Sequence, residues 1–446
     1  MIQRKVIIWA VIVAIGGFIF GFDTVVISGG EQAIQKYWEL GSFAHGLTTS
    51  IAIVGTIFGA LFGSIPADKI GRKKSLLIIA CLFLFSALGT AVVTNWYLFM
   101  VLRFIGGMGV GASSVIAPIY ISEISPAAAR GRLVILFQTN IVFGIVIAYL
   151  SNLLIVSILG PAHTDAWRYM LGVMAVPSLV FLILLPLVPE SPRWLLLQGR
   201  TDEATTVFKI MNPGGYEQEM VVINKANADD AADPGSNVLF SGRYKFPIWL
   251  AILIAFFNQT SGINAILYYA PRIFQMTGLG KYSSLEQSLM LGIVNFTFTM
   301  LAISVIDKIG RKKMMLIGSF GLILALGLVA YSFFTKSFSG FYVTGYLCAF
   351  IGFFSFSQGA VIWVFISEIF PTQVRAKGQT LGSFTHWFMA AAITFIFPFF
   401  TEKLGGGPTF LFFTVMMVLQ LIFVIKVMPE TKGKSLEDIE HTLVGH

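Results

Sequence analysis

Twelve long apolar stretches constrain this chain more than any other feature of its sequence. A helix needs about 20 apolar residues to cross the ~30 Å hydrocarbon core of a bilayer. Windows of that kind lie at residues 6–28, 46–66, 75–95, 97–121, 133–157, 170–189, 246–270, 288–306, 314–333, 340–366, 378–400 and 408–428. Charged residues make up 12% of the chain, about half the ~25% of soluble domains, so the polar surface of a soluble fold is missing. The sequence predicts an all-α membrane protein with twelve transmembrane helices.

The basic residues predict how these helices are oriented. With a cytoplasmic N-terminus, 23 of the 30 Lys and Arg residues fall in the termini and the even-numbered loops. Arg103 lies within a span, and six lie on the other side: Lys36, Arg168, Arg272, Lys281, Lys336 and Lys403. The positive-inside rule accounts for this asymmetry, and for the net charge of +8, without nucleic acid as a partner. We expect both termini and the central loop to be cytoplasmic.

Three motifs indicate that the chain is an internal duplication. They recur at offsets of 239, 245 and 240 residues: DKIGRKK at 68–74 and 307–313, ISEI at 121–124 and 366–369, and Pro-Glu at 189–190 and 429–430. Each copy holds six spans, an even number, so both copies start on the same face of the membrane. Such a parallel repeat predicts a substrate path between the halves, near the middle of the bilayer.

Asp23 and Arg103 stand out as ionisable residues well inside predicted spans, the first and the fourth. A charged side chain at the bilayer centre costs about 2.5–3.5 kcal/mol on insertion scales, and it marks a transport path or a proton relay. Because each charge alone would be costly, we expect the two to pair. Protonation of Asp23 would discharge the pair, which is a way to couple protons to transport. The alternative is that Asp23 caps the helix at the outer interface.

These motifs together resemble the sugar porter family of the major facilitator superfamily. The resemblance rests on both DKIGRKK copies, RFIGGMGVG…YISE……RGR across 103–132, PESPR at 189–193 and PETKG at 429–433, and it covers essentially the whole chain. It implies the major facilitator fold, two six-helix bundles that rock about a central sugar site. The expected domains are a bundle over 1–190, a cytoplasmic helical linker over 191–245, a second bundle over 246–430 and a cytoplasmic tail over 431–446.

The resemblance also implies a function. The segment GGFIFGFD, which ends at Asp23, is similar to that of proton-linked sugar porters, whereas mammalian facilitative glucose transporters carry Asn there. We therefore expect a secondary active transporter that imports a monosaccharide, a hexose, with protons. The alternatives are a facilitative uniporter, a non-transporting sugar sensor and a drug or anion antiporter. We expect no enzyme activity, because the spans hold no nucleophile–base pair.

Candidate sugar-binding residues are amides and aromatic rings. An amide offers a hydroxyl both a donor and an acceptor, and a ring covers the C–H face of a sugar. The candidates are Phe20, Gln138, Asn258, Gln259, Asn264, Asn295, Trp363, His386 and Trp387. For any single buried amide, the alternative is a hydrogen bond between helices. Gly262, between Gln259 and Asn264, is expected to break the seventh helix, which is tolerated where the backbone lines a cavity.

The candidate site departs from the family pattern at four positions. The segment from Asn258 resembles the family's QQxxGIN…YY, with Asn in place of the first Gln. His386, the only histidine inside the twelve windows, stands where the family commonly has an amide, and Ala390 stands where it has Asn. His386 could bind a sugar hydroxyl, titrate, or bond a neighbouring helix. Ala360 stands where the family usually has Pro.

Charged residues at the inner helix ends form the expected cytoplasmic gate. They are Asp68, Arg72, Glu123, Arg130, Glu190, Arg193, Asp307, Arg311, Glu368 and Arg375. The resemblance implies ion pairs across the halves that hold the inner side shut, and the alternative is a solvated interface. Exposed pairs contribute only ~0–1 kcal/mol each, so a network is required. We expect no cofactor and no metal, and a monomer in the lipid bilayer of a bacterial inner membrane.

Overall fold

The structure, a computed structural model, describes residues 3–126, 129–223, 239–240, 242–338, 342–371 and 374–433. Every regular element within these ranges is a helix. Twelve helical stretches among them are long and apolar enough to cross a membrane, which confirms the predicted fold class and number of spans. Parts of the predicted linker (224–238 and 241) and of the predicted tail (434–446) lie outside the described residues.

The first six spans carry short helices between them. The spans are α1 with η1 (Arg4–Val26, Ile27–Gly29), α3 (Ser42–Phe62), α5 (Arg72–Val92), α6 (Trp96–Glu123), α7 (Arg130–Leu159) and α8, α9 and η3 (Ala166–Gly172, Ala175–Leu184, Leu185–Leu187). The connecting helices are α2 (Glu31–Tyr37) and α4 (Ser64–Ile70), and the predicted linker begins with α10 (Pro192–Leu197) and α11 (Thr201–Met211).

The second six spans repeat this arrangement. They are α13 and α14 (Lys245–Thr260, Ile263–Tyr268), α16 (Lys281–Ile309), α17 (Arg311–Thr335), α18 and α19 (Tyr342–Phe356, Gln358–Glu368), α20 (Arg375–Lys403) and α21 (Gly406–Lys426). The short α15 (Ala270–Met276) follows α14, and η4 (Gly242–Tyr244) precedes α13.

The chain divides into two compact units that do not follow the duplicated halves. Unit 1 comprises Met1–Asp23, Gly55–Ile145 and Leu171–Ser236, and unit 2 comprises Thr24–Val54, Val146–Met170 and Asn237–His446. Unit 2 therefore holds the whole second set of spans together with end segments of helices from the first set. The domain boundaries expected from the sequence, at 190 and 246, stay a prediction.

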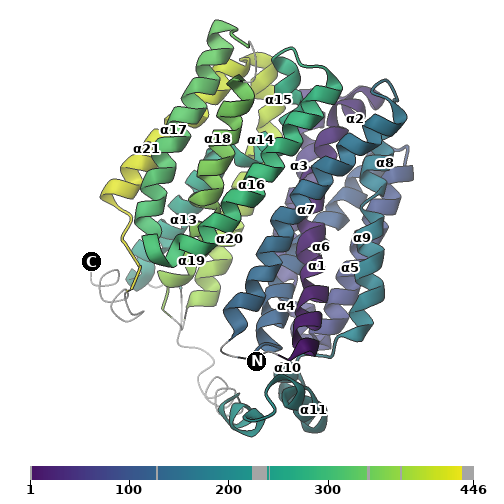
Figure 1. The fold of residues 1–446 in the computed structure, drawn as a ribbon, viewed down its shortest axis with the longest axis vertical. Coiled ribbons are helices and arrows are strands. Elements are labelled where there is room, and N and C mark those ends of the chain that lie inside the picture. The colour runs from purple at the N-terminus through teal and green to yellow at the C-terminus, as the bar shows by residue number, and fades with distance from the viewer. Residues whose placement is uncertain are drawn as a thin grey trace. The chain divides into compact units, whose positions relative to one another are not determined.

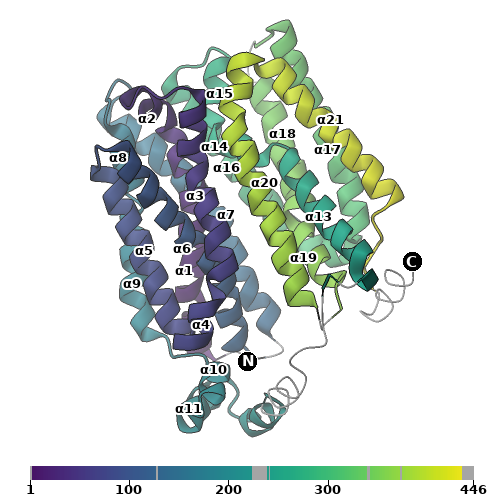
Figure 2. The ribbon, with the colours of Figure 1, turned by 180° about the vertical axis from the view of Figure 1, so that it is seen from behind.

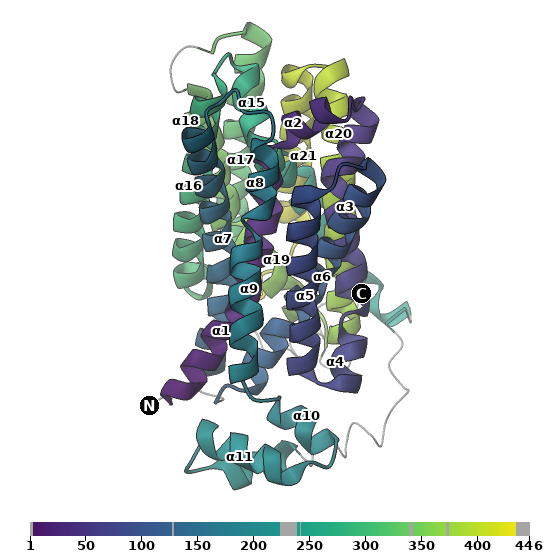
Figure 3. The same ribbon diagram turned by 90° about the vertical axis from the view of Figure 1, so that its right-hand side faces the viewer.

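In unit 1, glycines let α3 and α6 approach each other closely. Gly55 and Gly59 of α3 face main-chain carbonyls of α6, and a Cβ atom at either position would collide with them. Gly111 of α6 meets the carbonyl of Thr56 in the same way. Gly111, like Gly55 and Gly59, therefore serves close helix packing, as small residues do in membranes. Elsewhere in this unit α5 packs on α6 and α9, and α10 and α11 lie beyond the ends of α5 and α9 (Figure 3).

In unit 2, α17 packs between α18 and α21 (Figure 1), and α13 packs on α20 (Figure 2). The seventh span breaks as predicted: α13 ends at Thr260, and Gly262 adopts a left-handed conformation with φ of 86° before α14 begins. Glycine reaches this conformation without a steric penalty. The tenth span also breaks, at Ser357, although Ala360 replaces the proline of the family pattern.

Candidate functional site

Asp23 and Arg103 form a buried ion pair in unit 1. Arg103 Nη1 donates to Asp23 Oδ1 at 2.6 Å, and the two side chains are 1% and 4% exposed. Asp23 lies in α1 and Arg103 in the glycine-rich α6. The structure thus brings together the two charges that the sequence singled out inside the spans.

Asp23 is the single acceptor described for this arginine. Arg103 Nε and Nη2 are buried, and they have no hydrogen-bond partner among the residues that the structure describes. Arginine stays charged under all ordinary conditions. Protonation of Asp23 would therefore leave a buried guanidinium without a countercharge, a costly state that favours rearrangement of the helices.

Four of the predicted sugar-binding residues form a connected network in unit 2. Gln259 donates to Asn258 Oδ1 at 3.0 Å and contacts the ring nitrogens of His386 at 3.2 and 3.3 Å. Asn264 donates to Gln259 Oε1 at 2.8 Å. Asn258 in turn donates to the main-chain carbonyl of Gln358 at 3.3 Å. The broken seventh span supplies three of these side chains, and α20 supplies His386.

The carbonyl of Gln358 fixes the polarity of the whole network. A carbonyl accepts only, so Asn258 presents its NH₂ group to it and its oxygen to Gln259. Gln259 therefore presents its own NH₂ group to Asn258 and His386, and its oxygen to Asn264. His386 must accept this hydrogen bond, which requires an imidazole nitrogen without a proton. Asn258 and Gln259 are fully buried, whereas Asn264 and His386 each keep 9% of their surface exposed.

The remaining sugar-site candidates lie as follows. The ring of Trp363 lies 4.9 Å from that of His386, and Trp387 lies edge-on to His386 at 4.9 Å. Asn295 in α16 is bound separately, because its oxygen accepts from Ser355 at 2.8 Å. The two candidates in unit 1 are half-buried: Phe20 in α1 and Gln138 in α7.

The two DKIGRKK motifs fold into matching charge clusters, one in each unit. In unit 1, Arg72 binds Glu123 at 3.2 Å, and its main-chain N–H donates to Glu190 at 2.9 Å. In unit 2, Arg311 binds Glu368 at 2.7 Å. Its main-chain N–H donates to Glu430 at 3.0 Å. Glu430 was not among the predicted gate residues, although the Pro-Glu repeat pairs it with Glu190.

Each cluster is built from residues of its own half. Asp68 and Asp307 each bind the arginine four residues on at 3.0 Å. The expected pairs across the halves stay a prediction. The other predicted members bind main chain or lie beside the clusters: Arg130 donates to the Ser122 carbonyl, Arg375 donates to the Phe370 carbonyl, and Arg193 is half-buried on α10.

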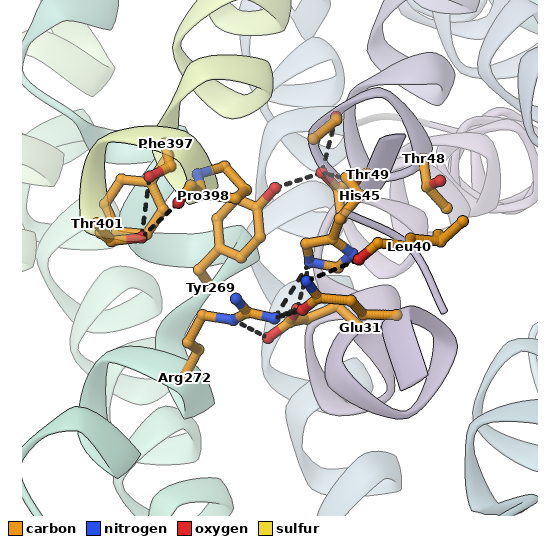
Figure 4. Close-up of polar contacts among 12 residues, drawn as sticks. Glu31, Leu40, His45, Thr48, Thr49, Tyr269, Arg272, Phe397, Pro398 and Thr401 are labelled. Atoms are coloured by element: carbon orange, nitrogen blue, oxygen red, sulfur yellow. Dashed lines mark hydrogen bonds and ion pairs between the residues drawn. The ribbon is translucent and has the colours of Figure 1, made fainter. Parts of the chain in front are cut away.

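A third charged group, which was not predicted from the sequence, lies in unit 2 on α2, α15 and the start of α3. Figure 4 shows its members Glu31, His45 and Arg272. Glu31 accepts from Arg272 Nε and Nη2 at 2.9 and 2.7 Å, and it binds His45 Nε2 at 2.6 Å. Arg272 also donates to Gln35 at 2.5 Å. Arg272 is one of the six basic residues that the predicted topology places on the non-cytoplasmic side. That exception to the positive-inside rule is the one sequence feature that pointed to this group.

The prediction that His386 is the only histidine within a span is wrong. The second span begins at Ser42, four residues before the predicted window, so His45 lies inside it and His386 is not the only histidine within a span. A window of hydropathy cannot place the first turn of a helix, because that turn carries polar residues that satisfy free N–H groups or meet the interface.

The surroundings of Glu31, Arg272 and Tyr269 shift the pKa values of these three residues. Burial acts to raise the pKa of Glu31, but Arg272 and His45 outweigh it and hold that pKa below its usual value of 4.5. Burial acts to lower the pKa of Arg272, and Glu31 outweighs it, so the net shift is upward. Burial also raises the pKa of Tyr269, whose hydroxyl bonds Thr49. Glu31 and Arg272 therefore stay ionised throughout the neutral range.

Comparisons with known proteins agree along the whole chain. A family model described as "Sugar (and other) transporter" matches residues 9–443. The arabinose-proton symporter of Bacillus subtilis is 36% identical over 430 residues, which cover 96% of this chain and 92% of that protein. The glucose transporter GlcP of Staphylococcus epidermidis is 36% identical over 433 residues, which cover 96% and 95%.

A solved structure is similar as well. The partially occluded inward open conformation of the xylose transporter XylE from E. coli matches with a TM-score of 0.86 and 32% identity. The match covers 97% of this chain and 100% of that one.

Proposed function

Since the chain belongs to the sugar porter family of the major facilitator superfamily, we propose that it imports a monosaccharide together with protons by alternating access. The relatives named above are an arabinose-proton symporter, a glucose transporter and a xylose transporter. The substrate class is therefore a five- or six-carbon sugar, and preference for a hexose is the narrower proposal.

The Asp23–Arg103 pair carries the proposal of proton coupling. The pair is buried, and in the described part of the chain the guanidinium has Asp23 as its single acceptor. A proton on Asp23 changes the charge of this site by one unit in a low-dielectric interior, where charge differences are large in energy. Proton binding thereby shifts the balance between arrangements of α1 and α6.

The network around Gln259 is proposed to bind the sugar. Asn264 and His386 hold the exposed surface, so they meet the hydroxyl groups, while Asn258 and Gln259 orient them from behind. This assigns Asn258, the departure from the family's glutamine, to positioning. Trp363, 37% exposed beside His386, offers an aromatic face to the C–H side of a sugar ring. Phe20, Gln138, Asn295 and Trp387 remain proposed contacts.

The charge clusters of the two DKIGRKK motifs are proposed as the cytoplasmic gate. In each, one arginine and two glutamates tie the start of a span to the end of another. Paired side chains in a network stabilise more than isolated exposed pairs. We place this gate, both termini and the linker in the cytoplasm of a bacterium, and the protein in its inner membrane as a monomer, on the distribution of basic residues.

Uptake into proteoliposomes tests the proposal. We expect the native chain to accumulate sugar when the outside is acidified, and Asp23→Asn to equilibrate sugar without accumulating it. Asp202→Asn, which removes an exposed carboxylate on α11, is the matched control and should accumulate sugar like the native chain. Uptake that ignores the proton gradient would make the protein a uniporter. Failure to bind glucose, xylose, galactose and fructose would refute the sugar assignment.

A further inference from the structure

The group at the outer end of unit 2 has no role in the function proposed above. We call Glu31, Gln35, His45 and Arg272 the Glu31 cluster (Figure 4). The side chains of Glu31 and His45 are fully buried, and that of Arg272 is 20% exposed. A carboxylate is buried at such a position only when its partners compensate its lost hydration. Here Arg272 supplies a bidentate ion pair and His45 a hydrogen bond.

The cluster joins segments from the two halves of the duplicated sequence. Glu31 and His45 precede and begin the second span, whereas Arg272 follows the broken seventh span. Two neighbouring contacts join the halves in the same way: Thr49 bonds the hydroxyl of Tyr269, and Ser42 bonds Glu402 at the end of α20. When the outer ends of the halves separate in alternating access, these contacts must break and water must reach His45.

Hydrogen-bond accounting fixes the protonation state of His45 in the closed cluster. Its Nε2 faces the carboxylate of Glu31 at 2.6 Å and therefore carries a proton. Its Nδ1 is buried, and no acceptor among the described residues reaches it. A second proton would create a buried N–H without a partner, and it would add positive charge 3.3 Å from Arg272 Nη2. The closed arrangement thus takes His45 in its neutral form.

We propose that His45 is a second proton-binding site of this protein, empty while the outer end is closed and filled when that end opens to acidic solution. The proton comes from outer water to Nδ1 and returns there before the end closes again. The site is separate from Asp23, and its direction in the transport cycle rests on the proposed function.

The charged and phenolic groups that face His45 do not change their own charge in the neutral range. They are Glu31 from α2, Arg272 from α15 and Tyr269 from the α14–α15 junction, with Glu402 of α20 acting on Arg272. The pKa of Glu31 is lowered, and those of Arg272 and Tyr269 are raised, so these three do not titrate between pH 5.5 and 7.5. An imidazole in water takes its second proton near pH 6.5.

The coupling between proton binding and opening determines how pH changes the ratio of closed to open molecules. Only the open state binds the extra proton, so acid favours opening. One proton bound only in the open state changes the ratio of closed to open molecules by at most about tenfold per pH unit.

A spin-label distance measurement tests this. Gly41 and Gly280 flank the cluster in the two halves, and each has open space where a side chain would start. We would label Gly41→Cys and Gly280→Cys, replace Cys81 and Cys348 by Ser, and keep Asp23→Asn throughout so that Asp23 cannot titrate. From pH 7.5 to 5.5 we expect the short-distance population to fall in its ratio to the long one, by at most about tenfold per pH unit.

His45→Gln keeps a donor to Glu31 and does not titrate, so its distances should not depend on pH. His163→Gln is the matched control on an outer loop and should behave like native. His45→Asn serves if His45→Gln does not assemble. The proposal is overturned if the chain with His45 shows no shift, or if the shift survives replacement of His45. Loss of sugar uptake would refute the proposed function while leaving this measurement intact.

Discussion

Arg103 donates from Nη1 to Asp23 Oδ1 at 2.6 Å, and the rest of its guanidinium meets no acceptor in the described part of the chain. The two partners differ in how they tolerate loss of the other. A buried Asp can take up a proton and become neutral, whereas a buried Arg keeps its charge.

This difference predicts unequal costs for the two single substitutions. We expect Asp23→Leu to destabilise by about 3–5 kcal/mol, the cost of an unpaired buried charge. Arg103→Leu should cost less, and the double substitution less than the sum of the singles. Unfolding in lipid nanodiscs, analysed as a double-mutant cycle, measures these terms. Additive costs would show that the pair is not coupled.

The polarity of the Gln259 network predicts that Asn258→Asp weakens sugar binding. The change is isosteric, but it replaces the donor to the Gln358 carbonyl with an oxygen and leaves two acceptors facing each other. We expect a loss of about 1–3 kcal/mol in sugar affinity, measured by calorimetry.

Asn95→Asp is the matched control for Asn258→Asp. Asn95 caps α6 with its oxygen alone, so an aspartate serves there equally well. Equal binding by both variants would contradict the assigned hydrogen-bond directions.

The pKa of Glu31 predicts a loss of stability in acid. Because the folded state lowers this pKa below 4.5, the ionised group stabilises the fold above that pH, and the contribution disappears as the pH falls through the lowered value. The native melting temperature should therefore drop below about pH 4.5. Glu31→Gln should melt lower at neutral pH and lose less in acid.

Glu203→Gln, at an exposed ion pair on α11, should follow the native pH curve. A pH curve of Glu31→Gln parallel to the native one would show that Glu31 is not ionised in the folded chain.

Replacing the glycine of a DKIGRKK motif by a residue with a side chain should destabilise the protein locally. Gly310 has φ of 98°, and a Cβ atom there would lie only 2.7 Å from Glu430 Oε2. We expect Gly310→Ala to destabilise by about 1–3 kcal/mol and to disorder the start of α17, seen as faster hydrogen exchange. Gly41→Ala, in open space, should change neither stability nor exchange.

The spans and the Asp23–Arg103 ion pair within them could be predicted because the bilayer makes both obligatory. A membrane-spanning helix must supply about 20 apolar residues, and a charged side chain within it must find a partner. Two opposite charges in separate spans are therefore expected to pair. Asp23 and Arg103 met that condition.

The Glu31 cluster could not be predicted, because charged residues at the ends of spans are not forced to pair. At the ends of spans, polar residues meet water as readily as they meet one another, so sequence gives no reason to pair Glu31 with Arg272. His45 also fell outside its predicted window by one residue. The inner charges posed a related problem: every arginine there had several acidic residues at the same depth, and the structure pairs Arg72 and Arg311 within their own halves.

The hydrogen bond from Asn258 to the main-chain carbonyl of Gln358 has a consequence for amino-acid substitution at position 358. Every amino acid carries that carbonyl, so the orientation of the recognition network does not depend on which side chain occupies position 358. A change of the side chain at position 358 would therefore not by itself reverse the direction of any hydrogen bond in the network around Gln259.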